Sequence, residues 1–308
     1  PYLRPSGILN LSNYTESLAN FFNGVDLDEF IVICNNPLPQ TDLSYCFFNA
    51  TFSTDSAIEA ILSNTTGVTN LDYCFYKTNV ADTSILNKVN TAAGCTMNYT
   101  FAECPNIKTL INIVIPSNVT EVEGMFNKCP LTTITNMTIN VAGSISGLFK
   151  GCDQLITIAT LRIPNVTDVS STFDGCTSLT NLTGFSLPDT CTKVDNLFNG
   201  CYALSVLTMS FGPNIVSGEN WYPPNLTTLN DTEILNSAVK LKDCTTLTDV
   251  NNMYIEKGDF NDLFNGCVKL TNLDIILGSE IGSMARMLKN CRKINTLPFT
   301  IPSTCTNI

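Results

Sequence analysis

Apolar positions recur along this chain with a regular spacing, closely after residue 96 and loosely before it. The recurring block is a Phe, a Cys three residues later, and two Leu or Ile at further steps of three, as in Phe173, Cys176, Leu179 and Leu182. An apolar residue usually precedes the Phe by four positions, and an Ile-Pro or Leu-Pro pair often follows the block. Self-similarity of this kind predicts a repeat architecture.

Twelve units are found when the Phe position is taken as the anchor of each. The steps between anchors run from 20 to 28 residues. We divide the chain into irregular N-terminal repeats, residues 1–96, and regular repeats, residues 97–308, which together make a single continuous solenoid. The anchors are Phe22, Phe47, Phe75, Phe101, Phe126, Phe149, Phe173, Phe198, Trp221, Leu241, Phe264 and Leu288.

The ninth unit departs from the pattern because Trp221 takes the anchor position and Pro224 replaces the Cys. Its spacing still fits the array, so we predict a full solenoid turn over residues 209–235 rather than a protruding loop. Trp221 is then expected to lie in line with the neighbouring Phe anchors, with Leu226 and Leu229 continuing the inner apolar stripe.

One such unit cannot bury its apolar stripe alone, and stacked units make a continuous core. We therefore expect an α/β solenoid of about twelve 20–28-residue units, with short strands on one face and short helices or turns on the other. The Leu-x-x-Leu segment predicts a strand ended by the following Pro, and Phe-x-x-Cys predicts a helical turn. Asp55–Ser63 and Asp82–Val89 resemble capped short helices, and a Gly before the Cys, such as Gly200, predicts a positive φ.

The order apolar-x-x-x-Phe-x-x-Cys-x-x-Leu-x-x-Leu followed by Ile-Pro resembles the BspA-like (Treponema-type) leucine-rich repeat. The resemblance covers nearly the whole chain, strongly over residues 97–308, and departs from the family at Trp221–Pro224 and in the first three repeats. The family is found on bacterial and protozoan cell surfaces and in phage-encoded surface proteins. The resemblance implies a leucine-rich-repeat solenoid and a role in adhesion or recognition.

The charge and composition of the chain argue against several classes of function. The chain has 308 residues, 16 basic and 27 acidic, with a net charge of −11, which argues against a nucleic-acid partner. It has no His, so His-based triads, Cys–His dyads and His–metal sites are absent. No apolar run approaches the roughly 18 residues of a membrane span, so we expect no membrane insertion. We expect no catalytic residues, no metal site and no cofactor; 36 Asn and 39 Thr stand where solubilising charge is usual.

Eight of the fourteen cysteines occupy one position of the repeat, and no Cys-x-x-Cys motif occurs. A cysteine in register with the repeat is expected to be a small buried apolar residue that stacks in a ladder. Stacking brings neighbouring cysteines to about 5 Å, so disulfide bonding stays open as an alternative. The eight are Cys104, Cys129, Cys152, Cys176, Cys201, Cys244, Cys267 and Cys291.

The candidate binding residues are Trp221 and Tyr222, which could form an aromatic platform for a ligand, although the alignment of Trp221 with core Phe residues favours burial. Glu121 and Glu123 could be the paired carboxylates of a glycoside hydrolase. The acidic run at residues 26–29 could bind Ca²⁺ through oxygen ligands, but it lacks an EF-hand loop and is better explained as a solvated end of the array.

These features favour a non-enzymatic recognition or adhesion module at the cell surface or outside the cell, whose partner is a protein or a glycan. The alternative is a bacteriophage virion protein of the tail, fibre or capsid surface that contacts neighbouring subunits. A carboxylate-dependent glycoside hydrolase is the weakest hypothesis. Because Phe299–Ile308 repeats Phe185–Val194 and then stops, we also expect residues 1–308 to be a fragment of a longer chain, or their exposed end to be covered by another subunit.

Overall fold

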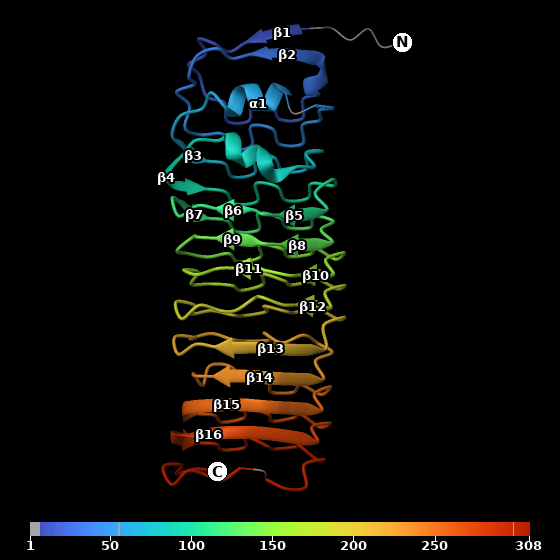
Figure 1. Cartoon of the computed structure of the whole chain (residues 1–308), viewed down its shortest axis with the longest axis vertical. Helices are drawn as coiled ribbons and strands as arrows, with labels where there is room; N and C mark the ends of the chain where they lie inside the picture. The colour runs from blue at the N-terminus through green and yellow to red at the C-terminus, as the bar shows by residue number, and fades with distance from the viewer. Residues whose placement is uncertain (1–6, 55, 298) are drawn as a thin grey trace.

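The computed structural model describes residues 7–54, 56–297 and 299–308. In this part the chain winds into a parallel β-solenoid of about twelve turns, with its N-terminal turns at one end and its C-terminal turns at the other (Figure 1). Each turn lies on the one before it, and the strands of successive turns pair in parallel along one side. The continuous solenoid expected from the repeats is therefore the observed architecture.

The strands are short in the N-terminal and middle turns and longer toward the C-terminus. Their pairing orders are β1-β2, β3-β4-β7, β5-β8-β10-β12, β6-β9-β11 and β13-β14-β15-β16. The strands are β1 (Gly7–Asn10), β2 (Phe30–Ile33), β3 (Val68–Asn70), β4 (Thr91–Thr96), β5 (Thr109–Ile111), β6 (Val114–Ile115), β7 (Val119–Glu121), β8 (Thr133–Thr135), β9 (Met137–Ile139), β10 (Thr157–Ile158), β11 (Leu161–Arg162), β12 (Asn181–Leu182), β13 (Val206–Phe211), β14 (Thr228–Ile234), β15 (Asp249–Asp259) and β16 (Asn272–Ser283). As expected, β6 ends at the residue before Pro116, which has no N–H for a ladder.

A file of stacked phenylalanine rings runs through the core. Each anchor ring from Phe22 to Phe198 lies parallel to the next, with ring centroids 5.3–5.9 Å apart. Phe173 is fully buried, as expected, between Phe149 and Phe198. The one-residue-per-turn repeat of the anchor thus becomes a continuous apolar column, which holds neighbouring turns together.

The cysteine that follows each anchor has a second role besides filling space. Its thiol donates a hydrogen bond to the backbone carbonyl of the anchor in the preceding turn: Cys176 Sγ lies 3.2 Å from the Phe149 oxygen, and Cys201 Sγ lies 3.0 Å from the Phe173 oxygen. Each of these buried carbonyls also accepts the backbone N–H of the cysteine in its own turn, Cys152 for Phe149 at 3.1 Å and Cys176 for Phe173 at 3.0 Å, so the thiol supplies the second donor to the oxygen. Cys244, which follows the irregular ninth turn, is the exception, with its thiol 4.0 Å from the Leu226 oxygen. Cysteine suits the position because it is small, apolar and still a donor.

Thiol accessibility provides a direct check on this ladder. All fourteen cysteines are free, and all are buried except Cys291 and Cys305, which are partly exposed. Burial raises the pKa of the buried thiols, to about 12 for Cys201, so the reactive thiolate is scarce as well as shielded. We expect a thiol reagent to modify Cys305 first and Cys291 more slowly in the native protein, and the other twelve only after unfolding. Mass spectrometry of the labelled protein counts them; fast labelling of more than two would contradict the ladder.

The face opposite the strands is built from turns rather than helices, which corrects the α/β expectation. The Phe-x-x-Cys segment is not a helical turn, because left-handed residues stand two before and two after the anchor, such as Asn196 (φ 55°) and Gly200 (φ 73°) on either side of Phe198. The left-handed glycine before the cysteine was predicted correctly. The helices of the described residues are the α-helix α1 (Ser56–Leu62) and the 3-10 helices η1 (Leu27–Glu29) and η2 (Thr83–Lys88).

The two short helices expected in the early repeats are present with narrower bounds. α1 falls within the first expected range, whose opening Asp55 lies outside the described residues. η2 falls within the second, and the Asp82 side chain accepts a hydrogen bond from the Ser84 N–H, as a helix N-cap does.

Many asparagine and threonine side chains donate hydrogen bonds to backbone carbonyls of the preceding turn. Thr271 Oγ1 donates to the Thr248 carbonyl of the turn before it at 3.1 Å, and Asn225 Nδ2 donates to the Tyr202 carbonyl at 2.9 Å. The Thr248 carbonyl also accepts the N–H groups of Thr271 and Asn272, so the hydroxyl adds a further donor to it, while the Asn225 amide supplies a side-chain donor to a carbonyl in a turn. The abundance of Asn and Thr is thus a property of the turns and not only a substitute for surface charge.

Candidate functional site

The degenerate ninth unit is a full turn of the solenoid, as predicted. β13 and β14 pair in parallel across it, with Leu207 opposite Leu229. Leu226 and Leu229 are buried and continue the inner stripe. No flap therefore leaves the array between residues 209 and 235.

Trp221 is fully buried, but it does not hold the anchor position that its alignment predicted. The Phe198 N–H donates to the Trp221 carbonyl at 3.0 Å, whereas the Phe173 N–H donates to the carbonyl of Leu197, the residue before an anchor. Trp221 is thus the equivalent of Leu197, and Tyr222 takes the backbone position of the anchor. The alignment was wrong by one residue because it was set by the match of Leu226-Thr-Thr-Leu229 to Leu131-Thr-Thr-Ile134, and the step from Tyr222 to Leu226 is one residue shorter than the step from Phe126 to Leu131.

The corner of the solenoid is cut short at this point. In regular turns the residue two before the anchor (the first corner position) and the residue two after it (the second) both have a left-handed backbone conformation. In the ninth turn only Asn220 does, and in the tenth only Asp243. The missing positions hold Pro224, whose ring fixes φ near −65°, and Val239, whose branched side chain disfavours positive φ. The left-handed residues of the first position are Asn20, Tyr45, Tyr73, Tyr99, Gly124, Gly147, Ser171, Asn196, Asn220, Asp262 and Arg286, and those of the second are Gly24, Asn49, Lys77, Glu103, Lys128, Gly151, Gly175, Gly200, Asp243, Gly266 and Asn290.

The shortened corner leaves a polar groove of about 820 Å³ on the turn face, which we call the corner groove. This volume is in the range of small-ligand sites. One wall comes from the segment 215–222, and the other comes from the segment 236–243 together with Asp262. The charged and hydrogen-bonding side chains that line it, apart from serine, are Glu219, Asn220, Tyr222, Asn236, Lys240, Lys242, Asp243 and Asp262.

Tyr222 is held firmly in the wall of the corner groove. Its hydroxyl donates to the Lys242 carbonyl at 2.6 Å, and its ring meets the Trp221 ring edge-on with centroids 5.8 Å apart. Burial raises the pKa of Tyr222, so the phenol stays neutral at physiological pH. Trp221 itself is anchored by its indole N–H, which donates to the Lys240 carbonyl at 2.8 Å. Of the two candidate residues, only Tyr222 borders a surface; this corrects the idea of a joint aromatic platform.

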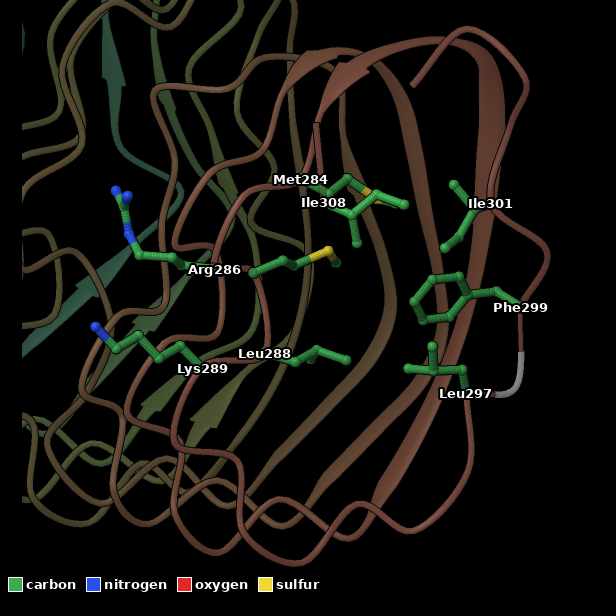
Figure 2. A pocket seen from close by; sticks show the side chains of 9 residues that line it. Met284, Arg286, Leu288, Lys289, Leu297, Phe299, Ile301 and Ile308 are labelled. Atoms are coloured by element: carbon green, nitrogen blue, oxygen red, sulfur yellow. The ribbon is translucent and has the colours of Figure 1, made fainter. Parts of the chain in front are cut away.

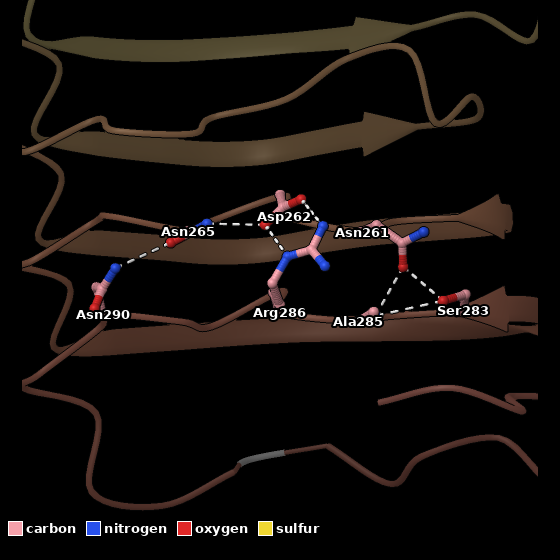
Figure 3. Close-up of polar contacts among 7 residues, drawn as sticks. All are labelled: Asn261, Asp262, Asn265, Ser283, Ala285, Arg286 and Asn290. Carbon is pink, nitrogen blue, oxygen red and sulfur yellow. Dashed lines mark hydrogen bonds and ion pairs between the residues drawn. The ribbon is translucent and has the colours of Figure 1, made fainter.

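Asp262, at the far side of the corner groove, is fixed by an ion pair. The Arg286 guanidinium donates from Nε and from an Nη to the two Asp262 oxygens at 3.0 and 2.7 Å, and Asn265 donates to the same carboxylate at 2.8 Å (Figure 3). The hydrogen bond from Arg286 is the main reason why the pKa of Asp262 lies below its ordinary value. A paired carboxylate of this kind shapes the groove without adding a free charge.

The remaining charges of the corner groove are of both signs. Lys240 and Lys242 extend from one wall, and neither forms an ion pair within the described part of the chain. Glu219 lies on the opposite wall and Asp243 beside the lysines. Ammonium donors, carboxylate acceptors and a firmly held phenol ring suit a polar ligand rich in hydrogen-bonding groups.

The other candidates from the sequence do not gather into sites. Glu121 and Glu123 are exposed on the outside of the array, and Glu121 accepts a hydrogen bond from the Asn98 amide. In the acidic run at residues 26–29, Asp26 accepts from the Asp28 N–H and Asp28 accepts from Ser53, so both carboxylates bind protein groups. Among the described residues, no three Cys, Asp or Glu side chains are placed to hold a metal ion, and no helix is long and apolar enough to cross a bilayer.

A second surface feature was missed by the sequence analysis. Tyr45, Tyr73 and Tyr99 stack on the turn face with ring centroids 4.8 and 5.0 Å apart, and Phe48 stacks on Tyr76 beside them at 4.9 Å. These partly exposed rings are of the type enriched at binding interfaces. The signal was present, because the three Tyr each precede a Phe anchor by two residues.

Comparison with known proteins identifies the repeat. The BspA type leucine rich repeat region model matches the chain in six copies, over residues 42–156 and 68–205. No curated protein and no solved structure matches it. The matched region spans more than half of the chain and carries the stacked Phe anchors and the cysteine ladder described above. The chain belongs to the BspA-type leucine-rich repeat family.

Proposed function

We propose that this protein is a non-enzymatic recognition module that acts at a cell surface or outside the cell and binds a protein or glycan partner in the corner groove. Leucine-rich-repeat domains typically bind proteins, and BspA-type members are commonly surface-associated. The observation that carries the proposal is the corner groove itself: a built recess of about 820 Å³ at a break in an otherwise regular array.

The chemistry of the corner groove suits binding better than catalysis. A hydrolase of the retaining or inverting type needs two carboxylates on either side of the scissile bond, one of them able to act as an acid. Here Asp262 is paired with Arg286, which keeps the carboxylate ionised and so unsuited to act as the acid. Rigid solenoids position such groups precisely in space, which favours recognition without chemistry.

Tyr222, Lys240 and Lys242 are the residues that we assign to partner contact. Tyr222 offers a ring edge whose orientation is fixed in advance, so little conformational entropy is lost on binding. The two lysines offer ammonium donors to carboxylate, carbonyl or hydroxyl oxygens of the partner.

The proposal is tested by binding of labelled protein to a glycan array and to a panel of intact cells. Lys240→Glu/Lys242→Glu is expected to weaken any binding by about tenfold or more, because it reverses two charges at the contact. The matched control is Lys108→Glu/Arg162→Glu, which changes the net charge equally at exposed positions away from the corner groove and is expected to bind as the unmodified protein does. Blank results for the unmodified protein on both formats would contradict the proposal.

A further inference from the structure

Partly exposed apolar side chains gather at places other than the corner groove. In the recess of the C-terminal turn, Met284 and Leu288 face Phe299 across an apolar space (Figure 2). Arg286 and Lys289 point away from that space, so their charges do not select a partner for it. The stacked rings of the early turns, in contrast, have polar groups beside them, and we call these rings the aromatic patch. They are Tyr45, Phe48, Tyr73, Tyr76 and Tyr99.

The aromatic patch consists of two columns of partly buried rings that touch each other. Tyr45, Tyr73 and Tyr99 form one column, in which neighbouring rings are nearly parallel with centroids 4.8 and 5.0 Å apart. Phe48 and Tyr76 form the other at 4.9 Å, and the columns meet between Tyr73 and Tyr76 at 5.7 Å. Parallel rings in contact at such separations are displaced sideways, so part of each ring face stays uncovered.

The tyrosine column occupies a backbone position that disfavours tyrosine. Tyr45, Tyr73 and Tyr99 have φ angles of 55°, 56° and 53°, in the left-handed region where Gly and Asn are the ordinary occupants. Other turns hold such residues at this position, for example Asn20 and Gly124. A side chain at Gly124 would collide with the Tyr99 ring, so the next turn leaves room for that ring. Three successive tyrosines at a strained position point to a role for the rings themselves.

The hydroxyl groups of the tyrosine column are available to a partner. Those of Tyr45, Tyr73 and Tyr99 have no protein hydrogen-bond partner in the part of the chain that the structure describes, whereas the Tyr76 hydroxyl donates to Glu103 at 2.7 Å. Burial raises the pKa of Tyr73, so its phenol stays protonated and can still donate. The column therefore presents a row of hydroxyls together with its ring surface.

Four carboxylates flank the tyrosine column, in its own turns and in the turn that follows. Asp42 and Glu121 stand five residues before an anchor, and Asp72 and Glu123 stand three before, next to the position of the tyrosines. Asn98 donates hydrogen bonds to both Asp72 and Glu121, at 2.7 and 2.8 Å, and so links these carboxylates across the stack. Within the described ranges none of the four forms an ion pair. Their negative charges are therefore not compensated locally.

A lysine of the chain itself shows how such groups bind an ammonium. Lys77 Nζ lies 5.2 Å from the centroid of the Tyr76 ring and 3.3 Å from a Glu103 oxygen, so an aromatic ring and a carboxylate hold it together. Tyr73 and its neighbour Asp72 present the same two groups, and no lysine or arginine of the described chain is paired with that carboxylate.

We propose that the aromatic patch binds a basic segment of a partner protein. Arginine or lysine side chains of the partner lie against the tyrosine rings and pair with the four carboxylates. Charge complementarity selects the basic partner, and the rings add contact area that a merely acidic surface lacks. The patch lies in the second to fourth turns, so it is a binding surface separate from the corner groove.

The test is fluorescence anisotropy of a labelled peptide of alternating Arg and Ser, titrated with the purified protein. We expect binding that weakens as salt is raised to about 1 M, where the screening length falls to about 3 Å. A matched peptide of alternating Glu and Ser is expected not to bind. Absence of binding by the Arg peptide, or equal binding of both peptides, would overturn the proposal. So would binding of a neutral oligosaccharide such as cellohexaose at the patch in place of the Arg peptide.

Two variants divide the contribution of the rings from that of the charges. Tyr45→Asn/Tyr73→Asn/Tyr99→Asn keeps the net charge and places a residue that tolerates positive φ at each position, so we expect a folded protein that binds the Arg peptide about tenfold more weakly. Glu121→Gln/Glu123→Gln is expected to weaken binding and to reduce its dependence on salt. Circular dichroism checks that each variant is folded.

The control variants change the same kinds of group elsewhere. Asp274→Asn/Glu280→Gln removes two negative charges at exposed positions of a distant turn, and Tyr202→Asn removes an exposed ring outside the patch. Both are expected to bind the Arg peptide as the unmodified protein does. Unchanged binding in either patch variant, or weakened binding in either control, would overturn the proposal. None of these readouts depends on a ligand of the corner groove, so the two proposals fail independently.

Discussion

Replacement of Phe173 by alanine is expected to lower the free energy of unfolding by about 3–5 kcal/mol, the usual cost of a large-to-small change in a core. The ring is fully buried and stacks between Phe149 and Phe198 at 5.8 and 5.5 Å, with Phe185 edge-on at 5.4 Å. Its removal opens a cavity between two turns that the backbone cannot close, because hydrogen bonds on both sides fix the spacing of the turns.

Urea denaturation followed by circular dichroism measures this effect. The matched control is Tyr202→Ala, which removes an aromatic ring of similar size that is 58% exposed; we expect a change within about 0.5 kcal/mol. A loss below about 1 kcal/mol for Phe173→Ala would mean that the stacked file is not a main source of stability.

Replacement of Trp221 by alanine is expected to destabilise the protein by a similar amount, about 3–5 kcal/mol, and to loosen the corner groove. The indole is fully buried, packs edge-on against Phe211 at 4.5 Å, and donates to the Lys240 carbonyl. Trp221→Phe retains most of the packing but leaves that carbonyl without its donor, which we expect to cost about 1–3 kcal/mol.

The two variants together separate packing from hydrogen bonding in the irregular turn. Both are measured by urea denaturation with circular dichroism, because Trp221 is the only Trp and its fluorescence is lost in each. Equal stability of Trp221→Phe and the unmodified protein would show that the indole hydrogen bond contributes nothing. Equal stability of Trp221→Ala would mean that this turn is not packed into the core.

The repeat positions were predictable because each apolar residue serves the same purpose in every turn. Phe, Cys and Leu recur where the interior has the same shape, so periodicity alone located the core, including Phe173 and Leu229. The turn face was not predictable in the same way. Its left-handed corner positions are filled by residues as different as Tyr45, Lys77 and Arg286, which seldom adopt positive φ, so no shared residue type marks them.

The corner groove was hidden for a related reason, since it arises from missing features. Pro224 and Val239 stand where other turns have left-handed residues, and neither draws attention in a search for reactive side chains. Tyr222 was singled out for its aromatic ring and does border the groove. Lys240 and Lys242 come from the next turn, and only the stacking of the turns brings them to the same recess.

Hydrogen exchange across residues 198–264 tests most directly the central claim that the irregular unit is an integral turn whose shortened corner forms the groove. β14 pairs in parallel with β13 on one side and with β15 on the other, its N–H groups donating and its carbonyls accepting. We predict that the amides of β14 exchange as slowly as those of β15, while the amides around Tyr222 and Asn236 exchange faster. Rapid exchange throughout residues 209–235 would contradict the account, because it would mean that this segment is a loop outside the solenoid.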